Sequence, residues 1–314
     1  MKSFKVIVNI LLVCVLSLFI LKIKASAQDL SHSLIISEQT ENSVNVSSLD
    51  LETNERTAIS EFNLDGLKLN PYSFNNIELS FSNDFEQMMV FKSDLKNLGF
   101  DGYDIGLIDE NGNYNSVFFG IVLKYFEDNG SQEKVKIANY HYDNPFIYND
   151  YLMSSFDVTM RKDKITTYSG YFMVPINDLS DNKLKIFTYE NGEFKREYND
   201  LTNEEKIMFS NLISHSDELT NNNINQDGDL LEGGILTKKD GSEIEILEPE
   251  AVEKIYDEGL FNENGEKVLY IAQPDKESSE FDIFETDIEN IELKKINTIN
   301  INNIESIEFL KWID

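Results

Sequence analysis

Residues 103–142 read YDIGLIDENGNYNSVFFGIVLKYFEDNGSQEKVKIANYHY, and this stretch decides the fold class. Two turn sequences divide it, DENGN at 109–113 and DNGS at 128–131. The Asn-Gly pair inside each turn favours a hairpin, because a two-residue hairpin loop needs positive φ at both central positions. The three apolar runs that remain, 103–108, 117–125 and 135–142, are therefore predicted to be antiparallel strands.

The same pattern recurs further along the chain. The turn sequence ENGE at 190–193 separates an apolar run at 184–189 from another at 194–198. One segment, 85–98, admits a second interpretation, because its apolar residues recur at near-helical spacing. We expect either a strand or a short helix there. The regular spacing of turns predicts a mainly β chain, with an antiparallel sandwich over residues 62–200.

Part of this region resembles exported immunoglobulin-like modules of Gram-positive bacteria. The residues concerned are GYFMVP at 170–175, followed by LKI at 184–186. In such modules a strand that ends in an apolar-Pro step precedes the last pair of strands. The resemblance implies that the sandwich is of the immunoglobulin-like kind.

A linking helix is predicted between two β-rich regions. Thr202 is a candidate N-cap, and Glu204 and Glu205 follow it in the first turn, where acidic groups favour a helix. We assign residues 201–222 to this helix and residues 223–314 to a smaller β-rich C-terminal domain. Within that domain a second helix is predicted at 249–256, and terminal strands are predicted at 299–301 and 307–309.

The first 27 residues have the layout of a secretory signal peptide. Lys2 and Lys5 precede an apolar run at 6–21, and Ala25 and Ala27 occupy the two positions that a signal peptidase recognises. We predict export and cleavage after Ala27; the alternative is a retained N-terminal membrane anchor. Cleavage removes Cys14, the only cysteine of the chain. A mature chain without cysteine favours a bacterium with a single membrane, since exported eukaryotic proteins more often keep disulfides.

Residues 28–61 form a polar segment that separates the leader from the predicted sandwich. They are rich in Ser, Asn, Thr and Glu, with short apolar stretches at 33–36 and 44–46. These stretches predict short edge strands, and a flexible segment is the alternative.

The charge of the chain limits its partners. It carries 57 acidic and 27 basic residues, for a formal net charge of −30. Such a charge repels nucleic acid and anionic lipid, so we expect neither to be a partner. We expect instead a cell-wall or extracellular protein or glycan, and no membrane insertion once the leader is removed.

The segment after the predicted linking helix has the spacing of a calcium loop. It looks like a loop of the EF-hand or dockerin kind, in which alternating oxygen ligands surround one cation and a glycine provides the sharp bend. The first position is Asn rather than Asp, and Gly234 takes the place of the usual bidentate glutamate. The alternative is a polar loop without a bound cofactor. The candidate ligands are Asn223, Asn225, Asp227, Asp229 and Glu232.

An aromatic cluster at 140–151 is the second candidate site. Tyrosines alternate there with amide, carboxyl and imidazole groups, a combination that sugar-binding surfaces use, with rings against the apolar face of the sugar. The alternative is that alternate rings face the core. The candidate ligand-binding residues are Tyr140, Tyr142, Tyr148 and Tyr151.

Sequence motifs for catalysis are few. The three histidines, His32, His141 and His215, lie far apart, and the chain has neither a zinc-hydrolase motif nor a nucleophile elbow. We therefore expect an exported or envelope-associated binding or structural protein without catalysis. The alternative is an exported carbohydrate-binding module or carbohydrate-active enzyme.

Overall fold

A computed structural model gives the structure of the chain. It describes residues 32–69, 78–93, 103–129, 136–161, 165–180, 183–190, 193–197, 201–203, 205–206, 229–232, 234–247, 259–262, 264–273, 279–300 and 306–313. The predicted leader lies outside these residues, as do the predicted helix at 249–256 and most of the predicted linking helix. In the described part of the chain, no helix is long and apolar enough to cross a bilayer.

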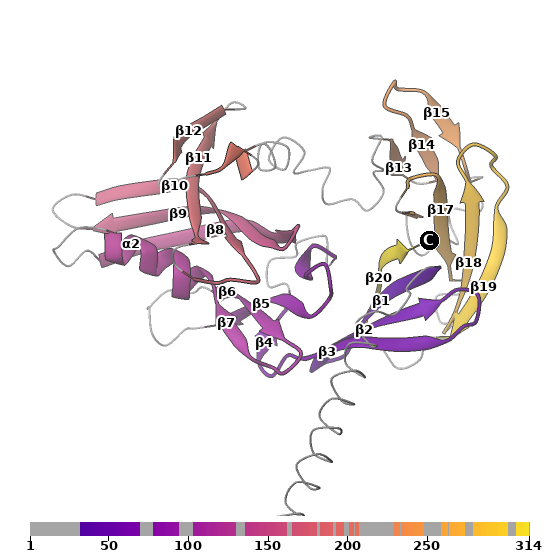
Figure 1. Cartoon of the computed structure of the whole chain (residues 1–314), viewed down its shortest axis with the longest axis horizontal. Helices are drawn as coiled ribbons and strands as arrows, with labels where there is room; N and C mark the ends of the chain where they lie inside the picture. The colour runs from indigo at the N-terminus through magenta and orange to yellow at the C-terminus, as the bar shows by residue number, and fades with distance from the viewer. Residues whose placement is uncertain are drawn as a thin grey trace, which may run out of the picture.

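The described chain is mainly β, as predicted, and forms five antiparallel sheets (Figure 1). Sheet A has the order β20-β1-β2-β3, made of Ser306–Ile313, Ser33–Gln39, Ser43–Asp50 and Arg56–Asn63. Sheet B has the order β4-β5-β6-β7, made of Leu67–Lys68, Gln87–Ser93, Tyr103–Asp109 and Tyr114–Ser116. A 3-10 turn at Glu78–Ser80 lies between β4 and β5.

The remaining three sheets follow in chain order. Sheet C has the order β12-β11-β10-β9-β8, made of Glu193–Glu197, Lys185–Glu190, Ile165–Pro175, Tyr151–Arg161 and Lys136–Tyr148. Sheet D contains β13 (Leu230–Glu232), β14 (Ile235–Thr237) and β15 (Glu243–Glu245). Sheet E contains β16 (Leu260–Phe261), β17 (Lys267–Ala272), β18 (Glu280–Asp287) and β19 (Lys294–Asn300).

The sheets pack face to face in the order C, B, A, E, D. One apolar cluster lies between C and B, another between B and A, a third between A and E, and a fourth between E and D. Sheets A, B and E are therefore buried on both faces. In sheet A, for example, Leu34 faces sheet E while its neighbour Ile35 faces sheet B. Burial on both faces explains why the central strands β1, β5, β6 and β17 have continuous apolar runs rather than alternation.

Sheet A takes strands from both ends of the described chain. β20 pairs with β1, and β1 in turn pairs with β2, so β1 is a central strand. The prediction that residues 28–61 hold only edge strands or a flexible segment is therefore wrong for β1, and also for β2, which lies between β1 and β3. For β1 the reason is that its partner β20 comes from the far end of the chain, which local sequence does not reveal. The division into domains at 61, 200 and 222 stays a prediction.

The structure does not confirm the immunoglobulin-like sandwich. Each sheet is a meander of strands that follow one another along the chain, apart from β20. An immunoglobulin-like sandwich instead has Greek-key connections that pass between its two sheets. The stretch at 170–186 that carried the resemblance forms the neighbouring strands β10 and β11 of one meander.

Two local predictions are corrected. Residues 117–125 were predicted as a strand, but Phe118–Leu123 forms a π-helix that continues into α2, Lys124–Asn129. Its buried residues Phe118, Ile121 and Val122 recur at helical spacing. Residues 85–98 contain the strand β5, in which Met88 and Met89 face opposite apolar clusters. A strand buried on both faces has an apolar run that periodicity cannot distinguish from a helix.

The predicted turn at 109–113 and the predicted N-cap are confirmed, whereas the predicted turn at 128–131 begins in the helix α2 and its second half lies outside the described residues. At 109–113 the carboxylate of Asp109 accepts the main-chain N–H groups of Asn111 and Asn113, and Gly112 has a φ of 78°. Thr202 Oγ1 accepts the N–H of Glu205 at 3.1 Å, and Glu205 Oε2 accepts the N–H of Thr202 at 2.7 Å. These reciprocal bonds are a capping box, which fixes the first turn of a helix.

Candidate functional site

The terminal sheet of the stack, sheet C, has one face packed on sheet B and one face turned away from it. We call the second face the outer face. Strand pairing places residues opposite one another on the same side, so the odd-numbered residues of β9 and β10 lie on the outer face. The even-numbered residues Leu152, Phe156, Val158 and Phe172 instead belong to the cluster shared with sheet B.

A bulge in β8 divides the aromatic residues that the sequence singled out. Asp143 pairs with Ser155, but Phe146 pairs with Met153, so β8 holds one extra residue between them. A bulge of this kind reverses which residues face each side. Pro145 lies in the bulge, where its missing N–H breaks no ladder bond. Tyr140 and Tyr142 therefore face sheet B, whereas Tyr148 lies on the outer face.

Tyr142 is a core residue, and Tyr140 is half-buried against the same cluster between sheets C and B. Tyr142 is buried, its ring lies 4.8 Å from that of Phe118, and its hydroxyl donates to the main-chain oxygen of Tyr103 at 2.6 Å. Tyr140 packs against Phe118 and Phe119. These two candidates match the alternative interpretation, in which alternate rings face the core.

Tyr148 and Tyr151 lie on the outer face together with aromatic residues that the sequence analysis did not select. The half-buried side chains there surround a buried floor of Met153, Met173, Phe187 and Leu201. The ring of Tyr171 is stacked on that of Phe187, with centroids 6.0 Å apart. We call this part the aromatic end of the outer face; its half-buried members are Phe146, Tyr148, Tyr151 and Tyr171.

A small polar group borders the aromatic end. Lys185 lies opposite Met173 on β11, and its ammonium nitrogen is 3.9 Å from Glu205 Oε2. The side chains of Lys185 and Glu205 are 22% and 16% exposed, so both remain accessible. Burial raises the pKa of Tyr151, and the negative charge of Glu205 raises it further. Tyr151 is therefore protonated at neutral pH and can donate a hydrogen bond.

The other end of the outer face is polar. His141 pairs with Asp157, and Asp157 pairs with Ser169, so the three side chains form one row across three strands. All three are exposed. Because positions two apart along a strand are about 6.5–7 Å apart, this row lies about that distance from the row of Tyr171. The ring of Tyr171 and this polar row thus lie within the dimensions of one or two sugar rings, whereas Tyr148 and Tyr151 lie about 20 Å from the row.

The calcium loop falls mostly outside the described residues. Asn223, Asn225 and Asp227 are not described, and of Glu232 only the strand position in β13 is. Asp229 is buried; its carboxylate accepts Lys238 Nζ at 3.0 Å and the N–H of Lys239 at 3.1 Å. Both oxygens of Asp229 therefore fix the turn between β14 and β15.

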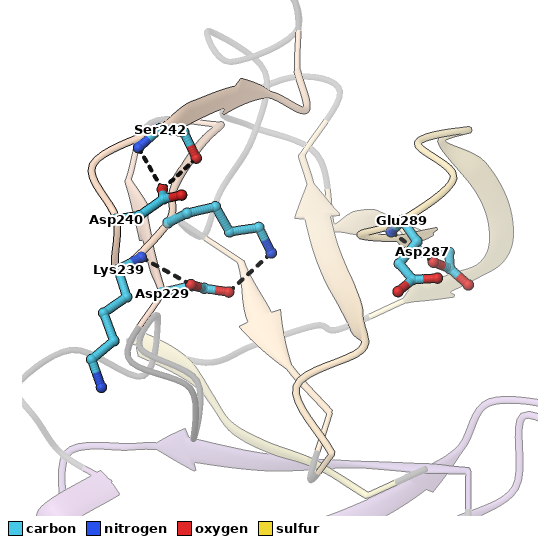
Figure 2. Close-up of polar contacts among 7 residues, drawn as sticks. Asp229, Lys239, Asp240, Ser242, Asp287 and Glu289 are labelled. Carbon is cyan, nitrogen blue, oxygen red and sulfur yellow. Dashed lines mark hydrogen bonds and ion pairs between the residues drawn. The ribbon is translucent and has the colours of Figure 1, made fainter.

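Two other acidic side chains, those of Asp240 and Asp287, also accept hydrogen bonds within turns (Figure 2). Asp240 accepts the N–H and the hydroxyl of Ser242, and Asp287 accepts the N–H of Glu289. Carboxylates commonly stabilise turns in this way. Within the described ranges, no group of three or more His, Cys, Asp or Glu side chains is arranged to hold a metal ion.

Comparisons with known proteins identify no family. No family model and no curated protein matches the chain. Among solved structures, a Bacteroides fragilis protein provisionally described as a 6-phosphogluconolactonase matches 90% of this chain and 99% of its own, at 11% identity and a TM-score of 0.36. The periplasmic gluconolactonase of Pseudomonas aeruginosa matches 86% of this chain and 81% of its own, at 10% identity and a TM-score of 0.27.

A third match is the AtxE2 isopeptidase, which covers 86% of this chain and 47% of its own, at 9% identity and a TM-score of 0.35. These similarities are too low to assign a family, a substrate or a mechanism. They nevertheless correct one expectation of the sequence analysis. Chains that align over most of this one include enzymes, so a non-catalytic binding or structural protein is not retained as the functional assignment.

Proposed function

We propose that the chain acts on a carbohydrate-like substrate that binds across the outer face of sheet C. One observation carries the proposal: the half-buried rings of Tyr148, Tyr151 and Tyr171 lie on the same sheet face as the exposed row of His141, Asp157 and Ser169. Sugars have an apolar ring face and a rim of hydroxyl groups, and this surface offers a partner for each.

The aromatic end supplies the contact with the sugar ring. Tyr171 is supported from behind by Phe187, and Met153 and Met173 form a buried floor beneath the rings. Rings held in this way lose little conformational freedom when a ligand binds. The hydroxyl groups of the substrate then face the polar end and the Lys185–Glu205 pair.

Glu205 is the proposed acid–base group. Its carboxylate lies beside Lys185 and close enough to Tyr151 to raise the pKa of that phenol. A carboxylate at the border of a substrate surface can accept a proton from water or from a hydroxyl group of the substrate. Glu205 also closes the capping box with Thr202, which fixes its position relative to sheet C.

The order of the sheets supports placing the substrate on the outer face of sheet C. The five sheets pack face to face in chain order, and β20 completes the sheet of β1, as in the blades of a β-propeller. We propose a propeller-like arrangement in which sheet C is the last described blade on one side. The predicted leader suggests cell-wall glycans as the source of the substrate.

Calorimetric titration with soluble peptidoglycan fragments, preceded by an oligosaccharide array, tests the binding part. Tyr171→Ala removes a stacking partner worth about 1–1.5 kcal/mol, so the Kd should rise roughly tenfold. Tyr140→Ala, a ring of the same sheet on the opposite face, is the matched control and should leave the Kd of the folded fraction unchanged. If no oligosaccharide binds, or if both variants bind like the wild type, the proposal fails.

Glu205→Gln tests the chemical part separately. Gln can also close a capping box, so this variant keeps the fold while it removes the carboxylate. We expect Glu205→Gln to bind the sugar identified by the array with a similar Kd but to release no product, as measured by chromatography of the reaction mixture. Unchanged product release would exclude Glu205 as the acid–base group.

A further inference from the structure

The outer face of sheet C is longer than a disaccharide requires. β9 and β10 pair without a bulge along their whole length, so side chains on one face repeat about every 6.5–7 Å along each strand. We call the row of His141, Asp157 and Ser169 the polar row. Tyr151 lies three repeats from this row, at about 20 Å, and Tyr171 lies one repeat from it. The rings and the polar row therefore follow one line along the sheet.

Two exposed carboxylates lie at the polar end of this line. Asp143 shares a row with Ser155 and Tyr171, and Asp157 lies in the next row, opposite His141. Both Asp143 and Asp157 are exposed. A ligand whose ring stacks on Tyr171 therefore has a carboxylate beside it in the same row and another in the row beyond.

The charge of the chain favours a cationic ligand over an anionic one. The formal net charge is −30, and the two carboxylates add negative charge to the ligand surface itself. Lys185, the base that borders the line, lies 3.9 Å from Glu205, which offsets its charge. An anionic sugar chain would be repelled by this surface, whereas ammonium groups would be attracted to it. The rings favour a sugar as the ligand, and the carboxylates favour one that carries positive charge.

We propose that the substrate of the outer face is a linear chain of amino sugars with free amino groups. This inference rests on the proposed function and names its substrate class. The distance of about 20 Å from Tyr151 to the polar row corresponds to a chain of roughly four sugar rings. One sugar stacks on Tyr151 near Glu205 and another on Tyr171, while protonated amino groups contact Asp143 and Asp157.

The length of the ligand can be tested with a series of glucosamine oligomers. Calorimetric titration of the full chain with the deacetylated dimer, tetramer and hexamer measures the Kd of each. A dimer cannot reach Tyr151 and the polar row together, whereas a tetramer can. The Kd should therefore fall about tenfold from dimer to tetramer and change little from tetramer to hexamer. A dimer that binds as tightly as the tetramer would overturn the extended site.

The amino groups can be tested at constant length. The N-acetylated tetramer has the same rings but no positive charge, so its Kd at low salt should be about tenfold higher than that of the deacetylated tetramer. Added salt should reduce this difference, because salt screens exposed charges. Equal affinities at low salt would exclude recognition of the amino groups.

A variant locates the charge contact. Asp157→Asn keeps the shape of the side chain and removes its charge, so the Kd of the deacetylated tetramer should rise about threefold. The Kd of the N-acetylated tetramer should not change. Glu61→Gln is the matched control, because it removes the same charge from an exposed position on β3, in sheet A. Circular dichroism checks that both variants are folded.

The outcomes separate this inference from the proposed function. If no oligosaccharide binds at all, both fail. If the deacetylated tetramer binds Asp157→Asn and Glu61→Gln equally well, its attraction is a diffuse effect of net charge and this inference fails. Binding of neutral peptidoglycan fragments that Tyr171→Ala weakens would then leave the proposed function intact.

Discussion

Leu34 on β1 lies opposite Trp312 on β20, so the first and last strands of the described chain are neighbours in sheet A. Both side chains are buried in the cluster between sheets A and E. Every sheet in the stack depends on its neighbours for burial, and sheet A connects the two halves of the stack. The pairing of β1 with β20 is therefore expected to control the stability of the whole chain.

Trp312→Ala should strongly destabilise the protein. Removing a fully buried aromatic side chain costs about 3–5 kcal/mol, through lost burial and the cavity that remains. Urea denaturation followed by circular dichroism measures the change. An exposed residue of the same sheet supplies the control: Glu61→Ala on β3 should change the free energy of unfolding by less than about 0.5 kcal/mol. Equal effects of the two variants would contradict the role of the Leu34–Trp312 pair.

Tyr142→Phe should destabilise the protein without affecting sugar binding. The substitution leaves the main-chain oxygen of Tyr103 without its 2.6 Å hydrogen bond, at a cost of about 1–2 kcal/mol. Tyr148→Phe, on the outer face, should leave the free energy of unfolding nearly unchanged. Denaturation and calorimetric titration of both variants separate the core role of Tyr142 from a ligand-binding role. A weaker sugar affinity in Tyr142→Phe would restore this residue as a candidate for the site.

Thr202→Ala should weaken the helix that begins beside the aromatic end. Loss of an N-cap hydroxyl costs about 1 kcal/mol. Because Thr202 and Glu205 bond to each other, the variants Thr202→Ala and Glu205→Ala should not be additive. A thermal double-mutant cycle measures this coupling, and Glu205→Gln serves as the conservative control. Additive losses would mean that the two bonds act independently.

The sequence predicted the class of secondary structure better than the pairing of its strands. Turn residues such as Asp109 and Gly112 act locally, so their hairpin could be recognised from neighbouring residues alone. The pairing of β1 with β20 joins positions at opposite ends of the chain, and no local pattern encodes it. Strands buried on both faces lose their alternation, so a continuous apolar run can be a strand or a buried helix. For this reason the segment of β5 admitted a helical interpretation, and the helix after β7 was predicted as a strand.

The candidate site was found only in part for a related reason. The sequence placed Tyr140, Tyr142 and Tyr148 in one candidate cluster, but the bulge at Pro145 puts Tyr148 on the opposite face from the other two. Pro145 itself was the signal, since proline within a strand commonly marks a bulge. Tyr171 and Lys185 reach the same surface from other strands. Only the register of β10 and β11 reveals their proximity.

Acid should weaken one link between strands of sheet E. The hydrogen bond from Lys295 lowers the pKa of Asp282, and the hydroxyl of Thr298 lowers it further, although partial burial opposes the shift. A carboxyl whose pKa is lower in the folded chain contributes stability above its unfolded pKa of about 3.9, and this contribution is lost as the pH falls through the folded value. Since Lys295 is 48% exposed, the effect should be below about 1 kcal/mol.

Urea denaturation should find Asp282→Asn less stable than the wild type above about pH 5, with the difference vanishing at lower pH. A difference for Asp282→Asn that persists unchanged in acid would show that the bond acts through geometry rather than through charge.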